Sequence, residues 1–171
     1  MPQTARDPRE IFLLRTRICE SDRDRVREIL DSTGFFNSAE VQMGVELAED
    51  RLRRGERSDY QFLFADLGEQ VLGYTCFGRI AGAQERYDLY WIAVHQRHRA
   101  RGLGRWLLGE SENRIAAMGG RRVYVETSAR PLYEPTRAFY LACGYKIGAV
   151  IDEFYAKGDS KVVFCKILAA D

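Results

Sequence analysis

The fold is decided by the stretch Tyr87-Asp-Leu-Tyr-Trp-Ile-Ala-Val94, which is followed directly by His95-Gln-Arg-His-Arg99-Ala-Arg-Gly102-Leu-Gly104-Arg-Trp-Leu-Leu108. Leu89 to Val94 form an apolar run bounded by charged residues, which predicts a buried strand. From Arg105 onward apolar residues recur at helical spacing, and Gly119-Gly120 predicts the end of that helix. The stretch therefore predicts a strand, a basic turn that contains glycine, and the first turn of a helix.

The turn between the predicted strand and helix has the features of an anion site. Gly102 and Gly104 allow backbone N–H groups to approach a ligand without an intervening side chain. These N–H groups lie at a helix N-terminus, where the helix dipole also favours negative charge. Arg99, Arg101 and Arg105 surround the turn and could offset phosphate charge, although a solvated basic loop would have the same composition. We predict that the turn holds a phosphate or a pyrophosphate.

Two other phosphate-binding loops can be compared with this turn. The chain contains no Gly-x-x-x-x-Gly-Lys-Ser/Thr sequence, which excludes a P-loop. Leu107 stands where a dinucleotide fingerprint has its third glycine, and one strand–helix–strand unit stands where that fold has two. Glu126 follows at about the spacing of a ribose-binding acid. A nucleotide-binding oxidoreductase therefore stays as a disfavoured alternative.

Two motifs together resemble the GNAT superfamily of N-acetyltransferases. Arg99-Ala100-Arg101-Gly102-Leu103-Gly104, directly after an Ile-Ala-Val strand end, resembles that family's acyl-CoA pyrophosphate loop. Thr136-Arg-Ala-Phe-Tyr140-Leu-Ala-Cys-Gly144-Tyr145 resembles its final helix, with a tyrosine four residues before a glycine–aromatic pair. The resemblance is strongest from about Tyr74 to Leu168. It implies an acetyl-CoA-dependent N-acetyltransferase in which an amine attacks the thioester directly in a ternary complex.

The resemblance also implies the residues that bind the cosubstrate. The backbone of Ile92, Ala93 and Val94 would contact the pantetheine arm, because in the family this strand splays from the next one, here Arg122–Thr127. A β-bulge would produce such a splay. The pyrophosphate would be held by the turn, whose residues are Arg99, Ala100, Arg101, Gly102, Leu103, Gly104 and Arg105.

Tyr140 resembles the family's general acid, the phenol that protonates the CoA thiolate. An ordinary tyrosine of an amphipathic helix is the alternative interpretation. Family members often carry an asparagine seven residues before this tyrosine, and here that position is Tyr133. The contact that the asparagine makes to the CoA arm must therefore be replaced or absent.

The sequence offers two candidates for the general base. Asp88 begins the central strand, at a spacing similar to the catalytic glutamate of the histone acetyltransferase branch. Glu126 ends the neighbouring strand and is similar to the glutamate of the ribosomal-protein N-terminal acetyltransferases. The context Tyr124-Val125-Glu126, just ahead of the helix with Tyr140, slightly favours Glu126. A salt-bridged carboxylate at either position, or a base that acts through a water chain, stays open.

The acceptor is a primary amine of unknown identity: a small amine, an amino acid or a peptide N-terminus. We expect its site between the Phe35-Phe36 linker and the last strand connection, where Asp152, Glu153, Phe154 and Tyr155 lie. Acidic and aromatic residues suit an ammonium group, but they equally suit an exposed loop. A non-catalytic acyl-CoA-binding domain, acting as a sensor, is the alternative function.

Hydrophobic periodicity predicts the order strand, two helices, three strands, helix, strand, helix, two strands. This order indicates a mixed α/β (α+β) sheet of the GNAT type, mainly antiparallel, with about seven strands and about four helices. We expect a first strand over Ile11–Cys19, a helix capped by Ser21 with Asp24, and a second helix capped by Asn37 or Ser38. The remaining expected strands are Phe62–Asp66, Val71–Phe77, Arg122–Thr127, Tyr145–Phe154 and Lys161–Leu168.

Length and composition set the remaining expectations. The 171 residues predict one domain over 1–171, with 1–9 as a frayed extension. A formal net charge of +1, with arginines alternating with acids, gives no reason to expect nucleic acid. The four cysteines form no Cys-x-x-Cys pair and no His cluster lies near them, so we expect no metal and reduced thiols in a cytoplasmic protein. There is no long apolar run, so no membrane partner is expected, and a homodimer is compatible with the sequence.

Overall fold

The computed structural model describes residues 12–168, which divide into two compact units. The N-terminal unit comprises the described residues up to Phe77 together with Trp91–Ser111, and the C-terminal unit comprises Gly78–Tyr90 together with the described residues from Glu112 onward. The expected extension at 1–9 lies outside the described residues. That the whole chain is one domain stays a prediction.

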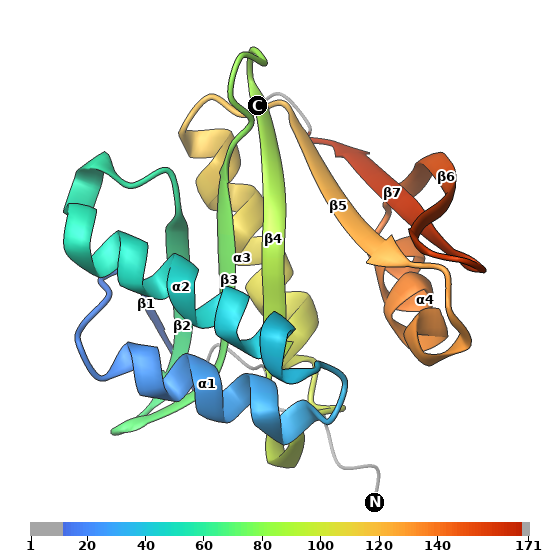
Figure 1. Cartoon of the computed structure of the whole chain (residues 1–171). Coiled ribbons are helices and arrows are strands. Elements are labelled where there is room, and N and C mark those ends of the chain that lie inside the picture. Colours follow the sequence, from blue (N-terminus) through green and yellow to red (C-terminus); the bar gives the residue numbers. More distant parts are fainter. Residues whose placement is uncertain (1–11, 169–171) are drawn as a thin grey trace, which may run out of the picture. The chain divides into compact units, whose positions relative to one another are not determined.

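The order of elements along the chain is the predicted one (Figure 1). The described residues form seven strands and four α-helices, and neighbouring strands are hydrogen-bonded in the order β1-β2-β3-β4-β5-β7-β6. The predicted mixed, mainly antiparallel fold class is thereby confirmed. The elements are β1 (Leu13–Arg15), α1 (Asp22–Thr33), α2 (Ser38–Arg54), β2 (Gln61–Leu67), β3 (Gln70–Arg79), β4 (Arg86–Val94), α3 (Leu103–Ala117), β5 (Arg122–Ser128), α4 (Glu134–Ala142), β6 (Lys146–Ala156) and β7 (Asp159–Ile167).

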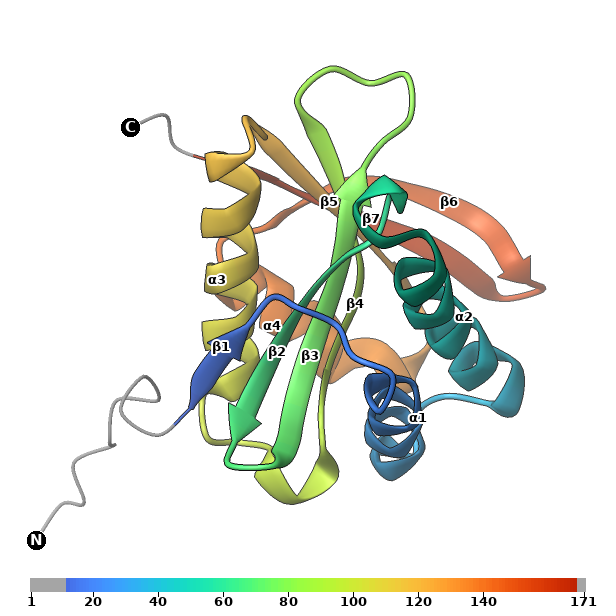
Figure 2. The same cartoon turned by 90° about the vertical axis from the view of Figure 1, so that its left-hand side faces the viewer.

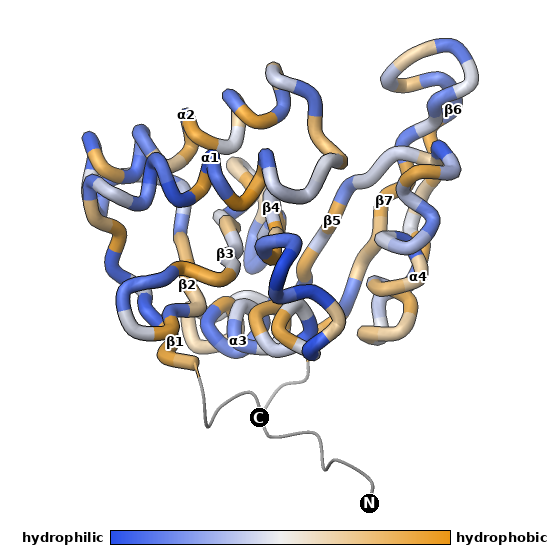
Figure 3. Tube along the Cα trace, turned by 90° about the horizontal axis from the view of Figure 1, so that it is seen from below, coloured by the Kyte–Doolittle hydropathy of each residue, from blue (hydrophilic) through white to orange (hydrophobic). Residues whose placement is uncertain are grey.

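In the N-terminal unit, helices cover both faces of the strands. α1 and α2 lie on one side of β2 and β3, and α3 lies on the other (Figure 2). Both α1 and α2 carry hydrophobic residues at intervals along an otherwise hydrophilic helix (Figure 3), as the predicted periodicity requires. The two apolar layers have separate cores: Val26, Leu30, Val45, Phe64 and Tyr74 lie under α1 and α2, and Ala65, Leu72, Leu103 and Leu107 lie under α3.

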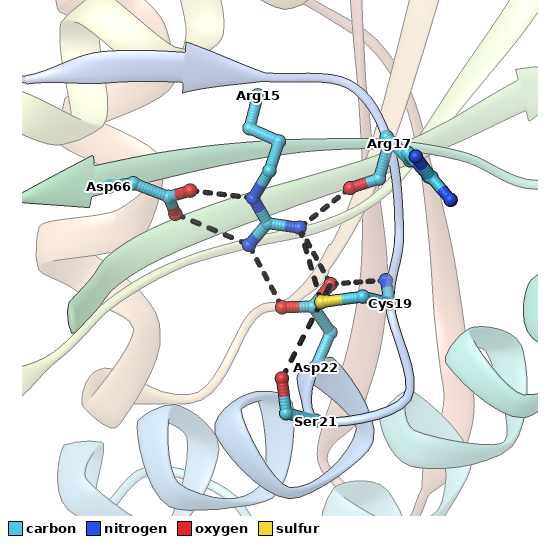
Figure 4. A network of polar contacts seen from close by, with 6 residues as sticks. All are labelled: Arg15, Arg17, Cys19, Ser21, Asp22 and Asp66. Carbon is cyan, nitrogen blue, oxygen red and sulfur yellow. Dashed lines mark hydrogen bonds and ion pairs between the residues drawn. The ribbon is translucent and has the colours of Figure 1, made fainter. Parts of the chain in front are cut away.

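The two helix starts of this unit test the predicted caps. Asn37 caps α2 through a capping box, because its side chain accepts from the Glu40 N–H and the Glu40 carboxylate accepts from the Asn37 N–H. The predicted cap of α1 by Ser21 with Asp24 is wrong, because the Ser21 side chain makes no capping hydrogen bond. Its place is taken by Asp22, whose carboxylate accepts from the Cys19 N–H at 2.7 Å (Figure 4).

In the C-terminal unit, β5 is the central strand. It pairs in parallel with the start of β4, with Asp88 opposite Tyr124, and antiparallel with β7, with Val125 opposite Phe164. Val123 and Val125 are 1% and 3% exposed, whereas Tyr124 and Glu126 point to the other face, as alternation predicts. α4 packs on the Val125 side, because the Tyr140 ring lies 5.6 Å from that of Phe164.

The last two strands differ from the predicted ones. β6 and β7 extend to Ala156 and Asp159, so the connection is a tight turn at Lys157-Gly158 and not the predicted six-residue loop. Every residue of β6 is exposed, and its pairing with β7 slips between Ile151 and Ala156. Polarity misled the prediction here, because a bulged and exposed strand carries loop-like residues. Among the residues that the structure describes, no helix is long and apolar enough to cross a membrane.

Candidate functional site

The basic turn has the backbone geometry of an anion site. α3 begins at Leu103, and its first intrahelical hydrogen bond runs from the Trp106 N–H to the Gly102 C=O at 3.0 Å. The N–H groups of Leu103 and Gly104 therefore precede the helical ladder at the positive end of the helix dipole. Gly102 has φ 77°, a left-handed conformation that glycine adopts without steric cost.

Basic side chains dominate the charge around this turn. Burial, together with the nearby Arg101, His95 and Arg97, lowers the pKa of His98 below its ordinary 6.5. Arg99 places its guanidinium 4.9 Å from the Phe35 ring centroid, so the turn contacts the α1–α2 linker within the N-terminal unit. The field is thus positive where the backbone donors are exposed, which suits a polyanionic group.

The end of β4 is packed so that its backbone remains the feature available for contacts. Ile92 and Val94 pack on the α3 core, whereas Ala93 belongs to the core beneath α1 and α2. Gly73 of β3 lies so close that a Cβ there would meet the Ala93 carbonyl oxygen at 2.9 Å. Side chains on both faces are therefore committed to packing, as the predicted main-chain role of Ile92, Ala93 and Val94 allows.

Tyr140 is a buried phenol held in an aromatic cluster. It is 4% exposed, and its ring lies 5.4 to 5.6 Å from the rings of Phe139, Tyr145 and Phe164. Burial raises the pKa of Tyr140 well above 10, so the hydroxyl stays protonated at neutral pH. A protonated phenol on a rigid support is what a proton donor requires.

The loop before α4 is anchored by side chains. Arg137 donates to the backbone carbonyls of Ser128 and Arg130, at 2.8 and 2.9 Å, and Asp159 accepts from Ser128 and Arg130. Tyr133, at the position of the family asparagine, is 9% exposed, with the Arg130 guanidinium 5.5 Å from its ring centroid. These contacts fix the start of the helix that carries Tyr140.

The two candidate bases lie on neighbouring strands, as predicted, and on the same face of them. Asp88 is opposite Tyr124, and Glu126 is two residues further along β5, so alternation puts both carboxylates on the same side. Burial, and then the charge of Glu126, raise the pKa of Asp88 above 3.8, whereas Lys161 acts in the opposite sense. The Glu126 carboxylate is 2.6 Å from the Lys161 ammonium.

Lys161 is the residue that sequence reasoning missed. It is 8% exposed, and its ammonium lies 3.5 Å from the ring centroid of Phe154 and 5.6 Å from that of Tyr155. The signal was a lysine that begins the apolar run Val162-Val-Phe-Cys165 on the same face as Glu126. Phe154 and Tyr155, expected to border the acceptor site, thus contact a cation that belongs to the chain itself.

The predicted site residues fall into two sets. The turn and the end of β4 belong to the N-terminal unit, and Asp88, Glu126 and Tyr140 belong to the C-terminal unit. Within the C-terminal unit the carboxylates and the phenol lie on opposite faces of β5 and β7, because Val125 and Phe164 share the Tyr140 side. Among the described residues no cluster of His, Cys, Asp or Glu could hold a metal ion.

Comparisons with known proteins identify the family of the chain. The family model "Acetyltransferase (GNAT) family" matches residues 23–145. The chain is 37% identical, over 92% of its length and 99% of the other chain, to a Desulfovibrio desulfuricans protein described as an acetyltransferase of the GNAT family, with a TM-score of 0.91. No curated protein matches the chain.

More distant solved structures share the fold. An aminoglycoside 6'-N-acetyltransferase complexed with coenzyme A is 16% identical, with a TM-score of 0.74 and coverage of 93% of this chain and 98% of that one. The ribosomal-protein-S18-alanine N-acetyltransferase from Escherichia coli is 14% identical, with a TM-score of 0.73 and coverage of 94% and 96%. At these identities the similarity concerns the fold alone.

Proposed function

Because this chain belongs to the GNAT family of acetyltransferases, we propose that it transfers an acetyl group from acetyl-CoA to a primary amine by direct attack in a ternary complex. The backbone of Ile92, Ala93 and Val94 contacts the pantetheine arm, and the turn from Arg99 to Arg105 holds the pyrophosphate. Acetyl-CoA supplies the activated thioester. The chain supplies a base for the amine and an acid for the departing thiolate.

One observation carries this proposal: the turn before α3 combines a left-handed Gly102, backbone N–H groups that precede the helical ladder, and surrounding basic side chains. The acid and base candidates lie on separate elements of the C-terminal unit. Tyr140 is on the Phe164 side of the β5–β7 pair, and Asp88 and Glu126 are on the other side. An amine that attacks a thioester loses its proton on one side of the reacting carbon, and the leaving sulfur gains one on the other.

Between the two carboxylates, we favour Asp88 as the base. A base works best with a pKa nearer to the working pH, and the pKa of Asp88 is raised. Glu126 already pairs with the Lys161 ammonium, so it suits an electrostatic role toward the acceptor better than proton uptake. This choice differs from the slight preference for Glu126 that the local sequence gave.

The function is tested by binding and by turnover. Acetyl-CoA or CoA should raise the melting temperature, since a ligand at a hundred times its Kd stabilises the native state by about 2.7 kcal/mol. NAD and ATP, as matched controls, should do so much less. A screen of amine acceptors that follows free thiol release should then find turnover. Equal thermal shifts with NAD would contradict the CoA assignment.

The same pair of measurements separates the alternative function. A non-catalytic acyl-CoA-binding domain would show the thermal shift with CoA but no thiol release with any amine.

Replacing Gly102 by valine should sharply weaken CoA binding. Gly102 has φ 77°, which a β-branched residue adopts only with strain, and a side chain there would also block the approach of a phosphate to the backbone. Gly109→Ala is the matched control, because Gly109 lies inside the same helix with nothing within 4 Å of a built Cβ. Calorimetric titration should show lost affinity in the first variant only, with native circular dichroism in both. Unchanged affinity in a folded Gly102→Val protein would refute this placement of the pyrophosphate.

Tyr140→Phe should lower turnover by on the order of a hundredfold and leave acetyl-CoA affinity nearly unchanged. The substitution keeps the ring contacts with Phe139, Tyr145 and Phe164 and removes only the proton. Phe139→Leu is the control for packing in the same helix. Steady-state kinetics with thiol detection measure both effects. If affinity fell while turnover persisted, Tyr140 would be a packing residue.

A further inference from the structure

We propose that Lys161 is a positioning residue that separates the roles of the two carboxylates: it holds Glu126 in an ion pair and leaves Asp88 to take up the proton. This inference rests on the proposed function, and it adds a residue to which neither the family resemblance nor the comparisons assign a role.

The contacts of Lys161 account for its burial. Its ammonium lies 2.6 Å from Glu126 Oε2, and the Phe154 ring centroid lies 3.5 Å away. A buried ammonium is costly unless it is paired, so both contacts are needed to keep it at 8% exposure. The side chain of Glu126 is half exposed, and its position is thereby tied to a buried cation.

A local irregularity in the β6–β7 hairpin positions the aromatic partners. Ile151 of β6 is opposite Lys161 of β7, and Ala156 is opposite Asp159. Residues 152–155 of β6 therefore form a bulge opposite a single residue of β7, Ser160. Glu153 sits in the bulge with φ 49°, and its carboxylate accepts from the Gly158 N–H at 3.0 Å. A non-glycine residue in this conformation costs free energy and is typical of functional sites. Here the bulge brings Phe154 and Tyr155 over the Lys161 ammonium.

Asp88 is the carboxylate that Lys161 leaves unpaired. Among residues 12–168, Asp88 makes no ion pair, and the charges that act on it most are Glu126 of β5 and Lys161 of β7. Side chains alternate along a strand, so Arg86 of β4 and Arg122 of β5 face the same side as Asp88, two residues before Asp88 and Tyr124 respectively. Tyr124 of β5 lies directly opposite Asp88. Glu126 favours the protonated form of Asp88, and Lys161 favours the ionised form.

The charges of Lys161 and Glu126 act in opposite directions on the pKa of Asp88, so removing one or the other should shift that pKa in opposite directions. Lys161→Met keeps a side chain of similar length and removes the charge, so the pKa of Asp88 should rise. Glu126→Gln removes the negative neighbour, so the pKa of Asp88 should fall. Lys161→Arg restores the charge and should bring the pKa back toward the wild-type value. Lys157→Met, in the turn of the same hairpin, removes an exposed lysine and should leave it unchanged.

The experiment is a carbon-13 NMR titration of the side-chain carboxyl of Asp88 in the full chain, without substrate. It needs no turnover, so it tests the role of Lys161 even if no amine is acetylated; absence of turnover would count against the proposed function only. Amide spectra of each variant report whether it folds. If Lys161→Met does not fold, Lys161→Arg is the variant of Lys161 that is measured. In an active protein, the acid limb of kcat/KM should move in the same direction as the titration. An Asp88 titration that is identical in all folded variants, or that moves the same way in Lys161→Met and Glu126→Gln, would overturn the inference.

Discussion

Asp88→Asn is expected to lower turnover by roughly two to four orders of magnitude, the range of general base catalysis. The substitution preserves the shape of the side chain and removes its capacity to accept a proton. Asp88 is partly buried on the acceptor face of β4, opposite Tyr124, so the isosteric amide should not disturb the strand. Acetyl-CoA affinity should stay close to wild type, since the proposed cosubstrate contacts are made by the turn before α3 and by the backbone of Ile92, Ala93 and Val94, and not by the Asp88 side chain.

The pH dependence of this loss has a definite sign. A base must be deprotonated, and the pKa of Asp88 is raised above 3.8, so the acid limb of wild-type kcat/KM should lie above the range of an ordinary aspartate. In Asp88→Asn that limb should disappear. The loss of turnover in Asp88→Asn relative to wild type should also become smaller as the pH rises, because more of the acceptor amine is then already deprotonated.

Two further variants serve as controls in the same assay. Glu126→Gln should mainly raise the KM for the acceptor, because Glu126 orients the ammonium without taking its proton. Glu69→Gln removes an exposed carboxylate of the β2–β3 turn, away from every predicted site residue, and should leave both constants unchanged. Wild-type profiles in both Asp88→Asn and Glu126→Gln would exclude either side chain as the base and leave a water chain or a non-catalytic domain.

The parts of the fold that were predictable from sequence are those with local signals. The apolar run into Val94 and the glycines of the turn predicted β4, the turn and α3, because each depends on residues adjacent in the chain. Alternation along β5 predicted that Glu126 faces away from Val125. Asn37 was one of the two residues predicted to cap α2, and it is the one that does so.

What the sequence did not predict depends on residues far apart in the chain. Lys161 and Glu126 meet only because β7 returns antiparallel beside β5, and their pairing changes which carboxylate suits proton uptake. The bulge at 152–155 depends on a slipped register with β7, which local polarity does not reveal. Ser21 does not cap α1: its backbone is already helical and its hydroxyl contacts the Cys19 sulfur, while Asp22 beside it makes a long-range ion pair with Arg15.

That ion pair joins three segments of the N-terminal unit (Figure 4). The Arg15 guanidinium of β1 donates to both carboxylate oxygens of Asp22, at 2.7 and 2.9 Å, and also to the carboxylate of Asp66 on β2. Asp22 is 1% exposed and also accepts from the Cys19 N–H at 2.7 Å. The hydrogen bonds and charges of both carboxylates raise the pKa of Arg15 despite its burial, so the guanidinium remains charged.

Asp22→Asn should therefore lower the free energy of unfolding by about 3 kcal/mol, near the lower limit for breaking a buried ion pair, because Arg15 keeps its contact with Asp66. Urea unfolding followed by circular dichroism measures the loss. Asp24→Asn is the matched control: it lies in the same first turn with its side chain 77% exposed, so its effect should stay within about 0.5 kcal/mol. Equal unfolding midpoints for the two variants would show that the helix start does not depend on the pair. The expected difference would instead show that β1, β2 and the start of α1 are held together by Arg15, in place of the serine cap that the local sequence predicts.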